Sequence, residues 1–154
     1  MFKDCLNLTE INLEGENITV IESNSFENCS KLKFESLPSN LTKIGDCAFR
    51  NCSLLNFKTF PSKIEEIGQN SFENCTQFNE LIFPESTKVI SKKAFKDCSK
   101  LEKVTFYSSS LVIKKKAFEN CRRLQEILTN NKDGFSTEAF ENCAQGIDFF
   151  KIEY

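Results

Sequence analysis

Apolar residues recur along the chain in one short pattern, which repeats every 22 to 24 residues. Each unit has Ile, a small residue, Phe and Cys in fixed order, then Leu, a second Ile and a final Phe that Pro often follows. A period of this length is typical of stacked coils, because one unit is too small to bury its own apolar face. The anchoring phenylalanines, each three residues before a cysteine, are Phe2, Phe26, Phe49, Phe72, Phe95, Phe118 and Phe140.

The pattern within a unit predicts three elements. Leu-x-x-Ile-x-Phe alternates at its end, which is typical of a short strand whose Ile and Phe point inward. Proline would end this strand because it lacks an N–H, and the three prolines share one column, at Pro38, Pro61 and Pro84. The return segments, such as residues 41–44 and 64–67, predict a second short strand. Ala-Phe-x-Asn-Cys predicts one helical turn.

Composition fits one domain and excludes several kinds of enzyme. The 154 residues predict a single repeat domain, residues 1–154, of about six and a half coils. The chain has no His, which excludes Ser-His-Asp and Cys-His catalysis and imidazole metal ligands. No two carboxylates stand out as general acid and base, so we expect a protein that is not an enzyme and needs no cofactor. No stretch approaches the roughly 18 apolar residues of a membrane span.

The segment 44–55, Ile-Gly-Asp-Cys-Ala-Phe-Arg-Asn-Cys-Ser-Leu-Leu, and its equivalents resemble the BspA-like leucine-rich repeats of bacterial surface antigens and some anaerobic protists. The resemblance covers essentially the whole chain. It implies a right-handed, curved leucine-rich-repeat solenoid, an α/β superhelix rich in β-structure. The parallel sheet would lie on the concave face, with short helical turns and short second strands on the convex side. The resemblance also implies a binding role, often in adhesion or recognition, and provides no catalytic residues.

Seven of the eight cysteines occupy one column of the repeat. Stacked one coil apart, they would have parallel Cβ directions, which is poor disulfide geometry, and their spacing does not match a zinc site. We therefore expect a ladder of buried free thiols, with disulfides or a metal site as alternatives. Cys47 lies in a column that is otherwise polar and is predicted to be exposed, either as an incidental thiol or as a handle for an intermolecular disulfide.

Charge is unevenly distributed along the chain. Residues 86–123 hold 11 basic and 3 acidic side chains, a net charge of +8, although the whole chain carries −2. Stacking would gather this charge on one flank, which would attract a protein or an anionic glycan unless the flank is merely solvated. Nucleic acid is disfavoured, because no aromatic side chains alternate with the basic columns. The partner-binding candidates on this basic flank are Lys92, Lys93, Lys96, Lys115, Lys116, Arg122 and Arg123.

Two units break the strand pattern in the same way. They have Glu35 and Lys58 where other units have an inward Ile or Val, and Phe34 and Phe57 come one position earlier. Either the strand slips by one residue and turns both rings inward, or the rings form an aromatic partner-binding patch on the concave face. Burying an unpaired charge is costly, which favours the slip. The other outward positions are mixed and polar, typical of a protein-binding face.

Neither end of the array has a recognisable cap, so we expect either a fragment of a longer array or a homodimer through a terminal coil. Residues 1–5 do not resemble a signal peptide. The expected location is the cytoplasm if the chain is complete, and the cell surface or exterior if it is a fragment. Six Asn-x-Ser/Thr sequons occur, and those directly before a repeat cysteine are expected to be turn residues. The sequons begin at Asn7, Asn17, Asn28, Asn40, Asn51 and Asn74.

These observations predict a non-enzymatic interaction module that binds a protein or glycan through the concave sheet or the basic flank. The alternative is a structural protein whose repeats associate end to end. A monomer with an open concave face would favour the module, whereas ends that form dimers or fibres would favour the structural protein.

Overall fold

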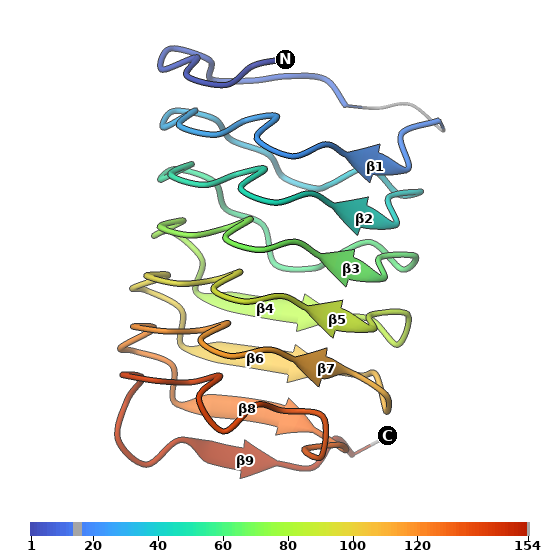
Figure 1. Ribbon diagram of the computed structural model, residues 1–154, viewed down its shortest axis with the longest axis vertical. Helices are drawn as coiled ribbons and strands as arrows, with labels where there is room; N and C mark the ends of the chain where they lie inside the picture. The colour runs from blue at the N-terminus through green and yellow to red at the C-terminus, as the bar shows by residue number, and fades with distance from the viewer. Residues whose placement is uncertain (14–16, 154) are drawn as a thin grey trace.

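The chain forms a parallel β-solenoid of about six turns in the computed structural model, which describes residues 1–13 and 17–153. The coils lie one above another, so the two ends of the chain lie at opposite ends of the stack (Figure 1). Two parallel sheets run along the stack, one of five strands in the order β1-β2-β3-β5-β7 and one of four in the order β4-β6-β8-β9. The predicted solenoid with parallel strands is confirmed.

The five-stranded sheet is built from the return segments, as the sequence predicts. Each strand has two residues, of which the second is an isoleucine buried in the core. The register advances by one repeat, so that Ile44 pairs with Ile67 and Ile67 with Ile90. The strands are β1 (Val20–Ile21), β2 (Lys43–Ile44), β3 (Glu66–Ile67), β5 (Val89–Ile90) and β7 (Val112–Ile113).

The four-stranded sheet consists of β4 (Glu80–Phe83), β6 (Lys103–Phe106), β8 (Glu126–Thr129) and β9 (Asp148–Phe150). Its inward positions are those that the alternation predicts, since Leu81 pairs with Val104 and Val104 with Ile127. The prediction is wrong for the first three coils. Residues 8–13 and 34–37 form no strand, and the third coil contributes only an isolated bridge between Thr59 and Ile82.

Ala-Phe-x-Asn-Cys forms tight turns, and the described residues contain no helix, so the predicted helical turn is wrong. The Phe49 N–H donates to the Ser71 carbonyl of the next coil at 2.8 Å, and the Asn51 N–H donates to the Glu73 carbonyl at 2.9 Å. In a helix, both N–H groups would instead donate to carbonyl groups of the same segment. The residue before each of the seven column cysteines has a positive φ, which Asn and Asp tolerate best among non-glycine residues. This column holds Asp4, Asn28, Asn51, Asn74, Asp97, Asn120 and Asn142.

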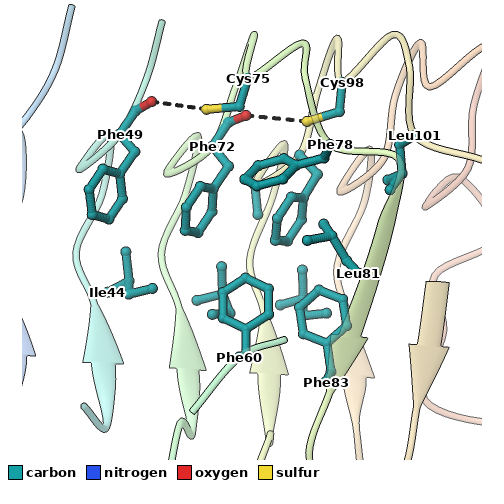
Figure 2. Close-up of a cluster of buried hydrophobic side chains, with 14 of the residues drawn as sticks. Ile44, Phe49, Phe60, Phe72, Cys75, Phe78, Leu81, Phe83, Cys98 and Leu101 are labelled. Atoms are coloured by element: carbon teal, nitrogen blue, oxygen red, sulfur yellow. Dashed lines mark hydrogen bonds between the residues drawn. The ribbon is translucent and has the colours of Figure 1, made fainter. Parts of the chain in front are cut away.

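The core is a stack of phenylalanine rings, one from each coil, as the Phe column predicts. Neighbouring rings in this column are nearly parallel, and their centroids are 5.1 to 5.6 Å apart. The rings of the strand ends, such as Phe60 and Phe83, pack edge-on against the stack. Figure 2 shows these two sets of rings with Ile44, Leu81 and Leu101 beside them. The chain therefore buries its apolar residues inside the coils, in one core that runs from Ile21 to Ala139.

Gly68→Ala is expected to lower the free energy of unfolding by about 1–3 kcal/mol, because it overpacks a close contact between coils. A Cβ atom at Gly68 would lie 2.6 Å from the carbonyl carbon of Gly45, which belongs to the backbone and cannot rotate away. Urea unfolding followed by circular dichroism measures the change. Ser91→Ala, at the same position of the next coil, is the matched control and should shift stability by less than about 0.5 kcal/mol. Equal effects of the two changes would contradict the close contact.

Candidate partner-binding surface

A groove of about 890 Å³ lies beside the first three coils, where the four-stranded sheet is absent. The Lys33 N–H donates to the Thr9 carbonyl at 3.0 Å, but no backbone hydrogen bond joins residues 34–37 to residues 10–13 or 57–60 of the described chain. The coils are therefore less tightly paired here than further along the stack. We call this feature the N-terminal groove; its lining includes Glu10, Ile11, Leu13, Lys33, Phe34, Glu35 and Leu54.

The inward turn of Phe34 and Phe57 explains why the strands are missing. Both rings pack edge-on against the phenylalanine stack, Phe34 at 5.9 Å from Phe49 and Phe57 at 6.0 Å from Phe72. Glu35 and Lys58 are correspondingly exposed, so the prediction that both rings turn inward and both charges stay out of the core is confirmed, although residues 34–37 form no strand that could slip. An aromatic partner-binding patch of both rings is wrong, because Phe57 is buried. Phe34 is half-buried and still lines the groove.

The outward side of β4, β6, β8 and β9, which we call the strand face, carries a mixed row of side chains. Ile82 pairs with Thr105, Thr105 with Leu128 and Leu128 with Phe150, so these four side chains lie side by side. Ile82 and Leu128 are half-buried, and Phe150 is 47% exposed. A parallel row of charges includes ion pairs between Lys58 and Glu80 at 2.7 Å and between Lys103 and Glu126 at 3.5 Å. The strand face thus offers apolar area bordered by both signs of charge.

The structure does not bring the seven basic candidates to one site. Lys92 and Lys115 lie together beside a shallow groove of about 530 Å³ next to β7. Lys115 also forms an ion pair with Glu138 at 2.7 Å, and Arg123 lies 3.7 Å from Glu102. Acidic residues of adjacent coils therefore offset charge that the sequence assigns to a single flank.

Lys93 and Arg122 differ from Lys96, Lys115, Lys116 and Arg123, because neither has an ion pair within the described part of the chain. Lys93 is half-buried, whereas Arg122 is exposed. Lys92 likewise has no carboxylate within ion-pair distance among the described residues. These three cations retain the free charge of the basic flank, but only Lys92 lines the groove next to β7.

Lys96 belongs instead to a ladder of charges, and Lys116 pairs with two members of that ladder. The ladder was not predicted from the sequence. The ladder is formed by the residue after each stacked phenylalanine, and its sign alternates from coil to coil up to Glu119. The signal is visible in the sequence as Lys3, Glu27, Arg50, Glu73, Lys96, Glu119 and Glu141. Lys96 lies 3.6 Å from Glu73 and 3.8 Å from Glu119, and Lys116 reaches Glu119 at 3.0 Å and Glu141 at 3.2 Å.

The ladder keeps its buried carboxylates ionised. Glu27 is only 1% exposed and lies between Lys3, at 2.9 Å, and Arg50. The hydrogen bond from Lys3 lowers the pKa of Glu27, and the nearby Arg50 lowers it further. The hydrogen bond from Lys116 in the same way lowers the pKa of Glu119. Since both carboxylates have stabilising cationic partners, they are structural groups and not candidate proton donors.

The cysteine column forms the expected ladder of free thiols, which are buried from Cys29 to Cys121 and half-buried at the two end positions, Cys5 and Cys143. From Cys29 onward, each thiol of the column donates to the carbonyl of the stacked phenylalanine in the preceding coil, as Cys75 does to Phe49 at 3.2 Å and Cys98 to Phe72 at 3.4 Å (Figure 2). Burial raises the pKa of Cys52 to about 12 and that of Cys75 well above its usual value. The described residues contain no group of three or more side chains able to hold a metal ion.

Cys47 is half-buried and not exposed as predicted. It has a φ of 55° in the turn that precedes Phe49, and partial burial raises its pKa. The equivalent residues, Asn24, Asn70, Lys93 and Lys116, also have positive φ. The turn therefore sets the direction of the Cys47 side chain, which lies closer to the neighbouring coils than its polar column suggests.

The sequon asparagines that precede a repeat cysteine are turn residues, as predicted. Asn51 donates through its side-chain amide to Asn28 at 2.7 Å, and Asn74 donates to Asn51 at 3.1 Å. All three have positive φ. Their amides therefore bond along the stack.

No helix of the described residues has the length and apolar character needed to cross a membrane.

Comparison with known proteins gives one family and several related structures. The family model for the BspA type leucine rich repeat region matches residues 1–75 and 55–153, in 6 copies. A leucine rich repeat protein of T. pallidum superposes with a TM-score of 0.71 at 26% identity, over 97% of this chain and 63% of that one. No curated protein matches the chain.

Two further solved structures are similar in fold. A leucine rich cell surface protein of Faecalibacterium prausnitzii has a TM-score of 0.71 at 22% identity, and a leucine-rich repeat protein of Eubacterium ventriosum has 0.68 at 20%. They cover 85% and 86% of this chain. The chain spans only 63%, 35% and 43% of the length of the three bacterial proteins.

Proposed function

Because the chain belongs to the BspA-type leucine-rich repeat family, we propose that it is a non-enzymatic module that binds a protein partner through the strand face and the N-terminal groove. The observation that carries the proposal is the continuity of these two surfaces. The groove adjoins the first three coils, and the third coil is joined to β4 by the bridge between Thr59 and Ile82. A partner could therefore contact most of the stack at once.

The chemistry of this surface favours a protein over an anionic glycan. Glu10 and Glu35 line the groove together with Lys33, and Glu80 and Glu126 lie on the strand face. These carboxylates would repel a polyanion. Partly exposed apolar side chains between charges of both signs are typical of a protein interface. The Faecalibacterium relative is described as a cell surface protein, and adhesion at a surface is the setting that we propose for this chain.

The double change Ile82→Glu and Leu128→Glu is expected to weaken partner binding by about tenfold or more, because it places charges in the apolar row of the strand face. Peptides selected from a random phage-displayed library on the wild-type chain serve as the probe. Their affinities for wild type and variant are measured by biolayer interferometry.

The matched control makes the same kind of change on the other sheet, at Val20 and Val112, which are 39% and 43% exposed. Val20→Glu with Val112→Glu should leave the peptide affinities unchanged. Peptides that bind both double variants equally well, or that lose affinity only for the Val20 and Val112 variant, would contradict the proposal.

A further inference from the structure

The bridge between the third coil and β4 shows how one coil bonds the next on this side of the stack. The Ile82 N–H donates to the Lys58 carbonyl at 2.9 Å, and the Ile82 carbonyl accepts from the Phe60 N–H at 3.0 Å. One residue thus uses both of its backbone groups toward the preceding coil, as in parallel strand pairing. The repeat predicts the same pair of bonds at the equivalent residue of each coil.

Ser36, two repeats before Ile82, does not form these bonds. The hydrogen bond from the Lys33 N–H to the Thr9 carbonyl sets the alignment of the first two coils, so Ile11 and Leu13 correspond to Lys58 and Phe60. The N–H and carbonyl of Ser36, the Ile11 carbonyl and the Leu13 N–H have no hydrogen-bond partner in the described chain. Two coils therefore leave complementary backbone groups unpaired.

The same residues line the N-terminal groove. Ile11, Leu13 and Ser36 all belong to its lining; Ser36 is exposed, and the other two are half-buried. The groove volume of about 890 Å³ lies within the usual range for ligand pockets, roughly 300–1,000 Å³. Unpaired backbone groups at the edge of a sheet bind an additional strand readily.

We propose that the N-terminal groove binds an extended segment of the protein partner, which adds to the sheet as a strand beside Ser36. This inference rests on the proposed function and specifies which part of the partner the groove recognises. The segment would accept a hydrogen bond from the Ser36 N–H and donate one to the Ser36 carbonyl, as the third coil does with Ile82. Its other edge would bond the Ile11 carbonyl and the Leu13 N–H.

The lining of the groove specifies a segment of alternating character. Successive side chains of a strand point to opposite faces, so one set would meet the apolar Ile11 and Phe34. The other set would lie near Glu10 and Glu35, neither of which forms an ion pair with a described residue. Lys33 is the one cation among the described lining residues, so the lining has an excess of negative charge. Basic side chains alternating with apolar ones are the complement of this surface.

Two changes at Ser36 separate backbone pairing from side-chain contact. Ser36→Pro removes the N–H, which is unbonded within the described residues, whereas Ser36→Ala keeps it. Both variants are compared with wild type by biolayer interferometry, with peptides selected from a random phage-displayed library on the wild-type chain. A class of these peptides should bind Ser36→Pro about tenfold more weakly or worse, because a peptide carbonyl loses its donor. Ser36→Ala should alter their affinity by no more than about twofold.

Charge at the groove gives a second comparison. Peptides of this class should carry Lys or Arg at alternate positions, and Glu35→Lys should weaken their binding severalfold. Glu22→Lys is the matched control, since Glu22 is exposed and directly follows β1 of the other sheet. It should leave their affinity unchanged.

Peptide analogues that carry a single backbone N-methyl group do not depend on the folding of a variant. Methylation at two adjacent central positions should abolish binding, because one of these N–H groups donates to Ser36 and the other to Ile11. Methylation near the peptide ends should be tolerated. If circular dichroism shows that Ser36→Pro does not fold, this scan alone decides.

Strand addition is overturned if no selected peptide distinguishes Ser36→Pro from a folded Ser36→Ala, or if the scan finds no sensitive position. Peptides that still lose affinity for the Ile82 and Leu128 double variant would then preserve the proposed partner-binding surface without strand addition. Peptides that are insensitive to all of these changes would contradict both proposals.

Discussion

Phe72→Ala is expected to lower the free energy of unfolding by about 3–5 kcal/mol, the usual effect of truncating a fully buried phenylalanine. Phe72 lies at the centre of the stack, with its ring centroid 5.2 Å from that of Phe49 and 5.1 Å from that of Phe95. It also packs edge-on against Phe60 and Phe78. No neighbouring ring can move into the space without leaving its own coil, so the cavity would persist.

The position of Phe72 increases the effect. Solenoid stability is approximately a sum over neighbouring interfaces, and the change weakens the interfaces on both sides of a central coil. Since natural domains are stable by only about 5–15 kcal/mol, the loss would remove a large part of the total. Guanidinium unfolding followed by circular dichroism measures it. A broadened transition would indicate that the two halves of the stack have become uncoupled.

Phe2→Ala is the matched control, because Phe2 occupies the same column and stacks on one ring only. Phe2→Ala should cost about 1 kcal/mol, the typical effect of a partly exposed substitution. If Phe72→Ala cost no more than Phe2→Ala, the phenylalanine column would not be the main source of stability.

The columns of the core could be predicted from the sequence because a strict period places equivalent residues above one another. The repeat period alone is enough to predict that Phe72 and Cys75 are buried, as they are. The inward direction of Phe57 could also be predicted, since Lys58 in the core would be an unpaired charge. The N-terminal groove could not, because it depends on hydrogen bonds lost between residues about one repeat apart.

The turns illustrate a different limit. Ala-Phe-x-Asn-Cys is compatible with a helical turn in composition, but the Asn51 N–H bonds the next coil, and its positive φ ends any helix. The restriction of this column to Asn and Asp was the available signal. For the basic flank, the count of lysines was correct, but Glu73 and Glu119 of adjacent coils pair with Lys96. The direction of each side chain decides which charges form ion pairs, and a count of charges along the sequence gives no information on that direction.

Cys75 is expected to react with iodoacetamide at least about a thousandfold more slowly than Cys47 in the folded protein. The attacking species is the thiolate, and burial together with a hydrogen bond to Phe49 keeps Cys75 protonated and inaccessible. Its alkylation requires separation of the coils, an opening whose free energy approaches that of global unfolding in a core. With about 5 kcal/mol of stability, that opening alone supplies a factor of about a thousand. Cys47 is half-buried and needs no such opening.

Mass spectrometry of peptides after timed alkylation measures both rates. In urea, where the coils are unfolded, the two thiols should react at similar rates, and Cys47→Ser should abolish the fast native phase that belongs to Cys47. Native rates within tenfold of each other would mean that the central coils open locally without unfolding. Such opening would contradict the thiol ladder as a rigid part of the core. A large difference would instead mean that Cys75 stays closed in the folded core, where it fills space and bonds the Phe49 carbonyl of the preceding coil.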